Sequence, residues 1–588
     1  MQSPLLEIKN LSVSFQTDDG IVDAVNDISF TLNIGETVGI VGESGSGKSV
    51  TSLSIMRLLA PESKTSGNII YHSPDKPPVD LTGIPLKEMR KFRGNDLAMI
   101  FQEPMTSLNP VFSCGNQVAE ALILHKKMNR HEARERTIEL FEKVKLPRPQ
   151  QMYDAYPHQL SGGQKQIVMI AMAMSCDPSV LIADEPTTAL DVTVQATILE
   201  LMRKLQGENN TGLLFITHDL GVVAEIADRI VVMYKGKIVE EGNVSDIFYH
   251  PQHPYTKGLL ACRPPLNKRL RILPTVRDFM EENEDGTISE IKNIIIDDNN
   301  EISREATQAL HDKLYLQSPI LSVKNLMVHF PIRKGLFGKV QGFVPAVDDV
   351  SFDVFPGETL GLVGESGCGK TTLGRAIIRL IEPTNGKVSF MGKDFLALYG
   401  KELRKMRKHI QIIFQDPYSS LNPRMTIGNA ILEPMKVHGL FPGNRKQKVY
   451  ELLERVNLKE EHFNRYPHEF SDGQRQRICI ARSLSLQPDF IICDESVSAL
   501  DVSIQAQILN LLNELKRDLH FTCIFISHDL SVVKFMSDRM IVMNKGKIEE
   551  IGNPDVIYSK PSSPYTQKLI DAIPASDPKL LFKNKKKA

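Results

Sequence analysis

Apolar and polar residues alternate along the chain in a way that predicts an α/β protein. Continuous apolar runs such as VLIAD at 180–184 and LLFIT at 213–217 are separated by longer stretches with helical spacing. Short uninterrupted runs of this kind are typical of parallel strands that are buried on both faces. The run ETVGIVG at 36–42 leads into a glycine-rich turn and then into a helix-forming stretch. We therefore expect parallel strands joined by helices.

The whole pattern occurs twice. VGESGSGKS at 41–49 returns as VGESGCGKT at 363–371, and LIADEPTTALD at 181–191 returns as IICDESVSALD at 491–501. Between the core segments of each copy lies a mostly helical region, for example HEARERTIELFEKV at 131–144. Each copy is thus predicted to be an α/β core with a helical insertion.

Residues 263–318 match neither copy. They contain an acidic stretch that is poor in apolar residues, which is typical of a linker that is partly disordered, with some local structure around ISEIKNIII at 288–296. We predict a first domain at 1–262, an acidic linker at 263–318 and a second domain at 319–588. The second domain ends in a basic tail, for which a solvated chain end is a simpler explanation than contact with a phospholipid or RNA.

Composition narrows the classes of function. The chain has 588 residues, with 70 Lys and Arg against 71 Asp and Glu, so no overall charge favours binding to nucleic acid. Its seven cysteines form no CxxC pair, which favours a reducing compartment over a disulfide framework or a metal site. The start of the chain lacks the pattern of a secretory signal, and no apolar run approaches the ~20 residues of a membrane span.

Two glycine-rich segments fit the pattern G-x-x-x-x-G-K-[ST] between a predicted strand and a predicted helix. Glycines let the main chain wrap an anion with its N–H groups, and the helix N-terminus adds positive potential. The lysines should reach the β- and γ-phosphates, and Ser49 and Thr371 should offer hydroxyls to Mg²⁺. The predicted phosphate-binding residues are Gly42, Glu43, Ser44, Gly45, Ser46, Gly47, Lys48 and Ser49, with Gly364, Glu365, Ser366, Gly367, Cys368, Gly369, Lys370 and Thr371.

Acidic residues follow one predicted strand in each half. Asp184 and Asp494 lie where a carboxylate can hold Mg²⁺ through its water shell. The next residues, Glu185 and Glu495, can polarise a water molecule for attack on the γ-phosphate. A surface pair of acids is the alternative, but the four apolar residues before each pair and the repetition favour the catalytic role.

One histidine in each half follows another apolar strand. His218 and His528 lie in the sequences THD and SHD. A single histidine at such a position is more often structural, whereas its repetition favours a sensor of the γ-phosphate.

Together these segments resemble a tandem pair of ATP-binding-cassette (ABC) nucleotide-binding domains. The resemblance is carried by the phosphate loops, the FQ segments, LSGGQ at 160–164 with its copy FSDGQ at 470–474, the ADEP and CDES strand ends, the ALD turns and the two histidines. It implies in each half a P-loop α/β core with a helical subdomain and a β-rich N-terminal part. HPYTKGLL at 253–260 and SPYTQKLI at 563–570, with the SLNP segments, further resemble the fused ATPases of glutathione- or microcin-type dipeptide and oligopeptide importers.

The resemblance implies two domains in head-to-tail contact, with two ATP and their Mg²⁺ ions between them. Each ATP would contact the loop of one half and the signature, LSGGQ or FSDGQ, of the other. Gln102 and Gln415 would link the metal and the attacking water to the helical subdomain, and Phe15 and Phe330 either stack on adenine or belong to the core. The signature residues implied are Ser161, Gly163, Gln164, Ser471, Gly473 and Gln474.

The same resemblance implies partners and a location. The chain would lie peripherally at the cytoplasmic face of the inner membrane, bound to two integral membrane permease subunits and indirectly to a solute-binding protein, without nucleic acid. ATP hydrolysis would power import of di- or oligopeptides or a related small solute. Only Cys262 lies near the end of the first copy, so we expect no iron–sulfur cluster of the kind that many relatives carry. An exporter ATPase and a soluble tandem ATPase acting on ribosomes or nucleic acid are the alternatives.

The two signatures differ at the first glycine. Asp472 stands where the first copy has Gly162. A carboxylate ~4 Å from a phosphate would cost about 4 kcal/mol at an effective dielectric constant of about 20, whereas a carboxylate turned to solvent would cost far less. Either the change is tolerated, or the ATP site built from loop 42–49 and signature 470–474 turns over more slowly than the other.

Overall fold

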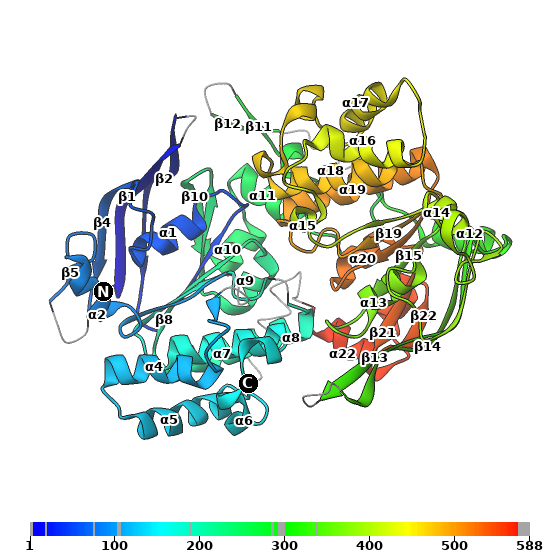
Figure 1. Ribbon diagram of the computed structural model, residues 1–588. Helices are drawn as coiled ribbons and strands as arrows, with labels where there is room; N and C mark the ends of the chain where they lie inside the picture. Colours follow the sequence, from blue (N-terminus) through cyan, green and yellow to red (C-terminus); the bar gives the residue numbers. More distant parts are fainter. Residues whose placement is uncertain are drawn as a thin grey trace.

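The structure is a computed structural model, in which two similar halves lie side by side (Figure 1). It describes residues 4–17, 20–73, 77–102, 107–188, 190–283, 287–291, 300–334 and 339–573. The basic tail lies outside these residues.

A six-stranded sheet forms the centre of the first half. Its order is β10-β9-β3-β8-β7-β6, and all neighbours are parallel except β10, which runs antiparallel to β9. The uninterrupted apolar runs become β7 and β8, which are buried along their whole length, as expected for strands covered on both faces. The strands are β3 (Thr37–Val41), β6 (Leu97–Ile100), β7 (Val180–Asp184), β8 (Gly212–Thr217), β9 (Arg229–Tyr234) and β10 (Lys237–Asn243).

Strands near the beginning of this half form a second sheet, which is antiparallel. Its order is β2-β1-β4-β5, formed by β1 (Leu6–Thr17), β2 (Gly20–Leu32), β4 (Ser63–Tyr71) and β5 (Val79–Asp80). The helices are α1 (Lys48–Ile55), α2 (Leu86–Phe92), α4 (Cys114–Lys126), α5 (Arg130–Lys143), α6 (Pro149–Asp154), α7 (Gly162–Met174), α8 (Val192–Asn209), α9 (Leu220–Ile226), α10 (Val244–Tyr249) and α11 (Pro254–Ala261). Helices α4 to α7 form the inserted helical region, below the sheets in Figure 1.

The second half repeats this plan. Its main sheet has the order β18-β19-β20-β15-β21-β22, and its antiparallel sheet has the order β14-β13-β16-β17. The strands are β13 (Leu321–Lys334), β14 (Lys339–Val354), β15 (Thr359–Val363), β16 (Asn385–Phe390), β17 (Lys393–Asp394), β18 (Ile410–Ile413), β19 (Phe490–Asp494), β20 (Thr522–Ile526), β21 (Arg539–Asn544) and β22 (Lys547–Gly552). The predicted α/β cores with helical insertions and β-rich N-terminal parts are thereby confirmed.

The helices of the second half take equivalent places. Helices α15 to α18 form its helical region, and α19 follows β19 as α8 follows β7. The helices are α13 (Lys370–Ile377), α14 (Gly400–Arg407), α15 (Pro417–Ser420), α16 (Ile427–Val437), α17 (Arg445–Arg455), α18 (Asp472–Leu484), α19 (Val502–Leu519), α20 (Leu530–Met536), α21 (Pro554–Ser559) and α22 (Pro564–Asp571).

Residues 263–318 contain structure and contact both halves. They form a 3₁₀ turn η2 (Val276–Asp278), a hairpin of β11 (Met280–Glu282) and β12 (Ile288–Glu290), and helix α12 (Arg304–Tyr315). Leu273, in this segment, is buried in an apolar cluster that also contains Val223 of the first half and Val533 of the second. The two halves therefore share part of their core. The proposed domain boundaries stay a prediction.

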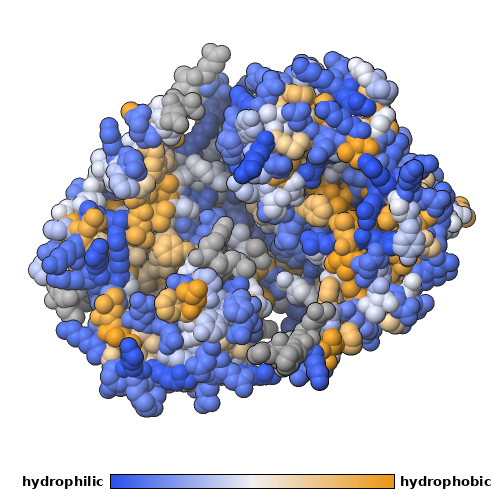
Figure 2. Space-filling view, in the orientation of Figure 1, coloured by the Kyte–Doolittle hydropathy of each residue, from blue (hydrophilic) through white to orange (hydrophobic). Residues whose placement is uncertain are grey.

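The outer surface is mainly polar. In Figure 2 hydrophilic residues cover most of the visible face of both halves, with separate apolar patches between them. Within the described residues, no helix has the length and apolar character needed to cross a bilayer.

Candidate nucleotide-binding sites

Each glycine-rich segment forms a loop between a central strand and a helix. Gly47, just before α1, has a φ of 98°, and Gly369, just before α13, has a φ of 108°. A side chain at either position would also collide with the main chain of β2 or β14, so both positions require glycine. The Lys48 ammonium donates to the carbonyl oxygens of Gly42 and Glu43, both at 2.8 Å. The loop thus wraps around the lysine that is predicted to bind phosphate, and Lys370 makes the equivalent bonds in the second half.

The loop hydroxyls meet the aspartates at the ends of the neighbouring strands. Ser49 Oγ donates to Asp184 at 3.1 Å, and Thr371 Oγ1 donates to Asp494 at 2.8 Å. The Oδ2 atom of Asp494 is buried without a hydrogen-bond partner among the described residues. Each half thus brings a hydroxyl and a carboxylate together, as the sequence predicted.

The glutamate after each aspartate binds the residues predicted to act with it. Glu185 accepts a hydrogen bond from Gln102 Nε2 at 3.0 Å and lies 3.5 Å from His218 Nδ1. In the second half, Gln415 donates to Glu495 at 2.9 Å, and His528 lies 3.6 Å from it. Both glutamates have left-handed backbones, with φ near 50°, a conformation that non-glycine residues rarely adopt outside functional or strained positions.

Burial and charge set the ionisation of these groups. Burial raises the pKa of Asp184 to about 6. Burial also acts to raise the pKa of Glu185, but hydrogen bonding and charge from His218 outweigh it and lower that pKa to about 2. The pKa of His218 is raised, because Glu185 outweighs the effect of its own burial. The pKa of Glu495 is lowered in the same way, by its histidine against burial, so both glutamates are ionised at neutral pH.

Residues of the ALD turns connect the two halves. Asp501 accepts a hydrogen bond from the main-chain N–H of Ser44 at 2.8 Å, and Asp191 accepts one from the N–H of Ser366 at 3.1 Å. Each aspartate therefore contacts the phosphate loop of the opposite half. The sequence did not assign Asp191 or Asp501 to the sites, although their repetition a few residues after β7 and β19 was a usable signal.

Two tyrosines, one threonine and one serine that contact the phosphate loops were also not predicted from the sequence. The hydroxyls of Tyr255 and Tyr565, from the HPY and SPY segments, accept hydrogen bonds from the N–H groups of Glu43 and Glu365 at 2.9 and 3.1 Å. Thr193 Oγ1 donates to Glu365 of the opposite half at 2.8 Å, and Ser503 makes the equivalent bond to Glu43. The PYT segments therefore support the phosphate loops directly.

The signatures lie at the N-termini of α7 and α18. Ser161 caps α7 by accepting from the N–H of Gln164 at 3.3 Å, and Ser471 caps α18 in the same way through Gln474 at 3.4 Å. Among the described residues, no hydrogen bond joins either serine to the opposite phosphate loop. In the part of the chain that the structure describes, the loops are thus hydrogen-bonded to the ALD turns of the opposite half and not to its signature serine.

The phenylalanines of the first strands differ in exposure. Phe15 packs against the apolar cluster under the antiparallel sheet, whereas Phe330 is 41% exposed. Both the adenine and the core alternatives stay open for them.

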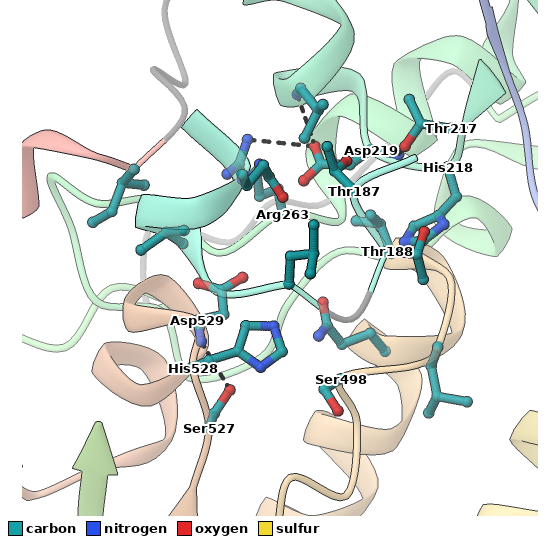
Figure 3. Close-up of a pocket in the computed structure, with 18 residues that line it drawn as sticks. Thr187, Thr188, Thr217, His218, Asp219, Arg263, Ser498, Ser527, His528 and Asp529 are labelled. Carbon is teal, nitrogen blue, oxygen red and sulfur yellow. Dashed lines mark hydrogen bonds and ion pairs between the residues drawn. The ribbon is translucent and has the colours of Figure 1, made fainter. Parts of the chain in front are cut away.

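A cavity of about 90 Å³ lies where the two halves meet (Figure 3). Equivalent residues of both copies line it, including His218 with His528 and Asp219 with Asp529. Arg263, which lies 3.6 Å from Asp219, takes the place that Ile573 has in the second copy. The two histidines thus lie near one approximate twofold axis between the halves.

Two family models match the chain in both halves. The model described as "ABC transporter" matches residues 25–188 and 347–498. The model described as "Oligopeptide/dipeptide transporter, C-terminal region" matches residues 239–286 and 550–588, which contain the PYT segments.

Similar proteins match nearly the whole chain. The glutathione import ATP-binding protein GsiA of Pectobacterium atrosepticum is 50% identical over 578 residues, which is 98% of this chain and 90% of the relative. The protein of the same name from Escherichia coli strain K12 is 50% identical over 580 residues, with the same coverage. Among solved structures, a dimeric ATP-binding cassette, MJ0796, in a post-hydrolysis state with ADP and Pi has 28% identity and a TM-score of 0.36, covering 40% of this chain and 98% of that chain.

The chain therefore belongs to the ATP-binding proteins of ABC transporters. Within that class it belongs to the oligopeptide/dipeptide transporter family, and it carries two ATPase domains in one polypeptide. The expected class, tandem organisation and ATPase activity are confirmed. The match in the C-terminal regions also separates the chain from the exporter and ribosome-associated alternatives.

Proposed function

We propose that this chain hydrolyses ATP to power the import of glutathione or another short peptide. The observation that carries this proposal is the 50% identity, over 98% of the chain, to glutathione import ATP-binding proteins. Their similarity extends through both halves and the linker, so the whole working unit is shared and not only a nucleotide-binding core.

Each ATP is bound by groups from both halves. Lys48 and Lys370, now bonded to their own loops, turn to the β- and γ-phosphates when nucleotide enters. Ser161 with Gly163 and Gln164 completes the site of the second loop, and Ser471 with its two neighbours completes that of the first. Closing of the halves brings these signatures onto the γ-phosphates, and the ALD contacts already hold the halves in the required order.

The residues present fit Mg²⁺. Ser49 with Asp184 and Gln102, and Thr371 with Asp494 and Gln415, supply the oxygen ligands that Mg²⁺ prefers, directly or through water. The buried Oδ2 of Asp494, which accepts no hydrogen bond among the described residues and lies 3.5 Å from Arg375 Nη2, is such a ligand atom. When bound, the ion neutralises charge that develops on the β- and γ-phosphates.

Hydrolysis uses the glutamate and histidine of each half. Glu185 and Glu495 are ionised and accept a proton from the water that attacks the γ-phosphate. His218 and His528 hold these carboxylates in place and contact the γ-phosphate. Gln102 and Gln415 bond the same carboxylates and lie beside the helical subdomains, so they report the state of the site to the membrane partners.

The partners are two integral membrane permease subunits and, through them, a solute-binding protein. The chain lies at the cytoplasmic face of the cell membrane, as a peripheral subunit. This proposal rests on the family and on the transport role that the names of its relatives state.

Uptake of labelled glutathione and of a labelled dipeptide tests the proposal. Cells without the chain should lose uptake of at least one of the two, and the wild-type chain should restore it. The variant with Glu185→Gln and Glu495→Gln should be expressed equally and restore nothing. Uptake that persists without the chain, or that returns with the double variant, would contradict the proposal.

A further inference from the structure

The linker crosses between the halves beside one of the two ATP sites. From α11 of the first half it reaches the second half, where Asn510 of α19 exchanges two hydrogen bonds with the main chain of Leu273, at 2.8 and 2.9 Å. It then returns to the first half, where Val276 packs against Gly258 and Glu282 pairs with Lys235. Turn η2 is therefore fixed at both ends, between the two halves.

A large cavity opens at this turn. Its volume is about 520 Å³, and its walls combine the signature of the second half with α19 and the linker. The lining includes Thr275, Arg277, Ser471, Gly473, Gln474 and Arg477. The signature of the first ATP site thus faces a space that the linker closes on one side.

Arg277 has no competing partner there. Among the described residues it makes no hydrogen bond or ion pair, and the neighbouring Asp278 is bonded within the turn, to the N–H and hydroxyl of Thr275 at 2.6 and 2.9 Å. The charge of Arg277 acts on Glu43, in the phosphate loop of the first half. Burial chiefly raises the pKa of Glu43, and Arg277 counteracts part of that rise. Arg477, from the signature helix, also lines the cavity, and the charge of Arg277 adds to burial in lowering its pKa. Two guanidinium groups therefore line the cavity beside the second signature, and the charge of one of them, Arg277, also acts on the first phosphate loop.

We propose that the linker supplies Arg277 to the first ATP site, where its guanidinium binds the phosphates of the nucleotide held by loop 42–49 and signature 470–474. This inference rests on the proposed function, because it requires ATP between that loop and that signature. A guanidinium suits the role, since it is always charged and presents several donors to phosphate oxygens. Arg277 would then be a binding residue that neither ATPase domain contains.

Photolabelling of the full chain with 8-azido-ATP and Mg²⁺ tests the inference, because labelled peptides of each half can be counted separately. Arg277→Ala should raise the half-saturating concentration for labelling of the first half about tenfold, the loss expected for one charge-assisted hydrogen bond. Labelling of the second half should not change. Arg277→Lys should recover part of the loss, since it keeps the charge.

Arg271→Ala is the matched control, because Arg271 is an exposed linker arginine that does not line the cavity. It should shift neither half. The inference is overturned if Arg277→Ala shifts neither half, or shifts both by the same factor. A wild-type chain that is labelled in neither half would overturn the proposed function itself, and the inference with it.

Discussion

The carboxylate of Asp501 accepts a hydrogen bond from the main-chain N–H of Ser44, 457 positions earlier in the chain, at 2.8 Å. Asp191 and Ser366 form the mirror-image contact at 3.1 Å. Each phosphate loop is therefore held by the turn that follows β7 or β19 of the other half. We therefore expect hydrolysis in one half to affect the position of the opposite loop.

Asp501→Ala should weaken this connection. The variant loses the bond to Ser44 and the charge that lies 4.0 Å from His218. Loss of a hydrogen bond to a charged group costs about 1.5–3 kcal/mol, so ATP turnover in the assembled transporter should fall about tenfold or more. Asp518→Ala, an exposed substitution in the same half, is the control and should leave turnover unchanged. Equal turnover in both variants would contradict the coupling role.

Asp472→Gly should have little effect on turnover. The Asp472 carboxylate is 66% exposed and pairs with Arg475 at 2.7 Å, at the start of α18, where a negative charge is favourable. This geometry favours a tolerated change over slow turnover at the first site. The reverse substitution, Gly162→Asp, should also be tolerated, since no atom lies within 4 Å of a side chain built there. ATPase assays of both variants in the assembled complex should agree with wild type within about twofold, and a several-fold gain in Asp472→Gly would restore the asymmetry hypothesis.

The stability of the folded chain should depend on pH through Glu43, which lies where the two halves meet. Burial, followed by the charge of Asp501, raises the pKa of Glu43 to about 7. The folded chain then binds this proton more tightly than the unfolded chain. Protonation of Glu43 therefore stabilises the folded chain at low pH, and this contribution to the free energy of unfolding, up to about 3 kcal/mol, is lost as pH rises from about 4.5 to about 7.

Thermal unfolding at pH 5.5 and pH 8 measures this effect in wild type and in Glu43→Gln. The wild-type midpoint should fall more between the two values than that of the variant, because the amide does not titrate. Identical pH dependence in the two proteins would show that Glu43 is ionised in the folded chain throughout this range.

The sequence predicted which site residues lie together within one half better than it predicted the contacts between the halves. The pairs Ser49–Asp184 and Gln102–Glu185 follow from motifs next to buried strands, whose ends must meet at one edge of a parallel sheet. The ALD aspartates form their hydrogen bonds with the opposite half. The motifs of one half alone do not indicate which residues of the other half they will contact. In the linker, the sequence predicted local structure around 288–296, where β12 begins, but not turn η2, helix α12 or the contacts with both halves. Its acidic composition hides the few apolar residues, such as Leu273, that anchor it.

The number of ATP molecules trapped per chain tests the shared sites most directly. With Mg²⁺ present and both Glu185 and Glu495 replaced by glutamine, the full chain should retain two ATP in equilibrium dialysis. Adding Ser471→Glu, which places a carboxylate against the nucleotide of the first loop, should reduce this to one, although every residue of that loop is intact. Retention of two ATP after the Ser471 change, or of none before it, would contradict an arrangement in which each half completes the site of the other.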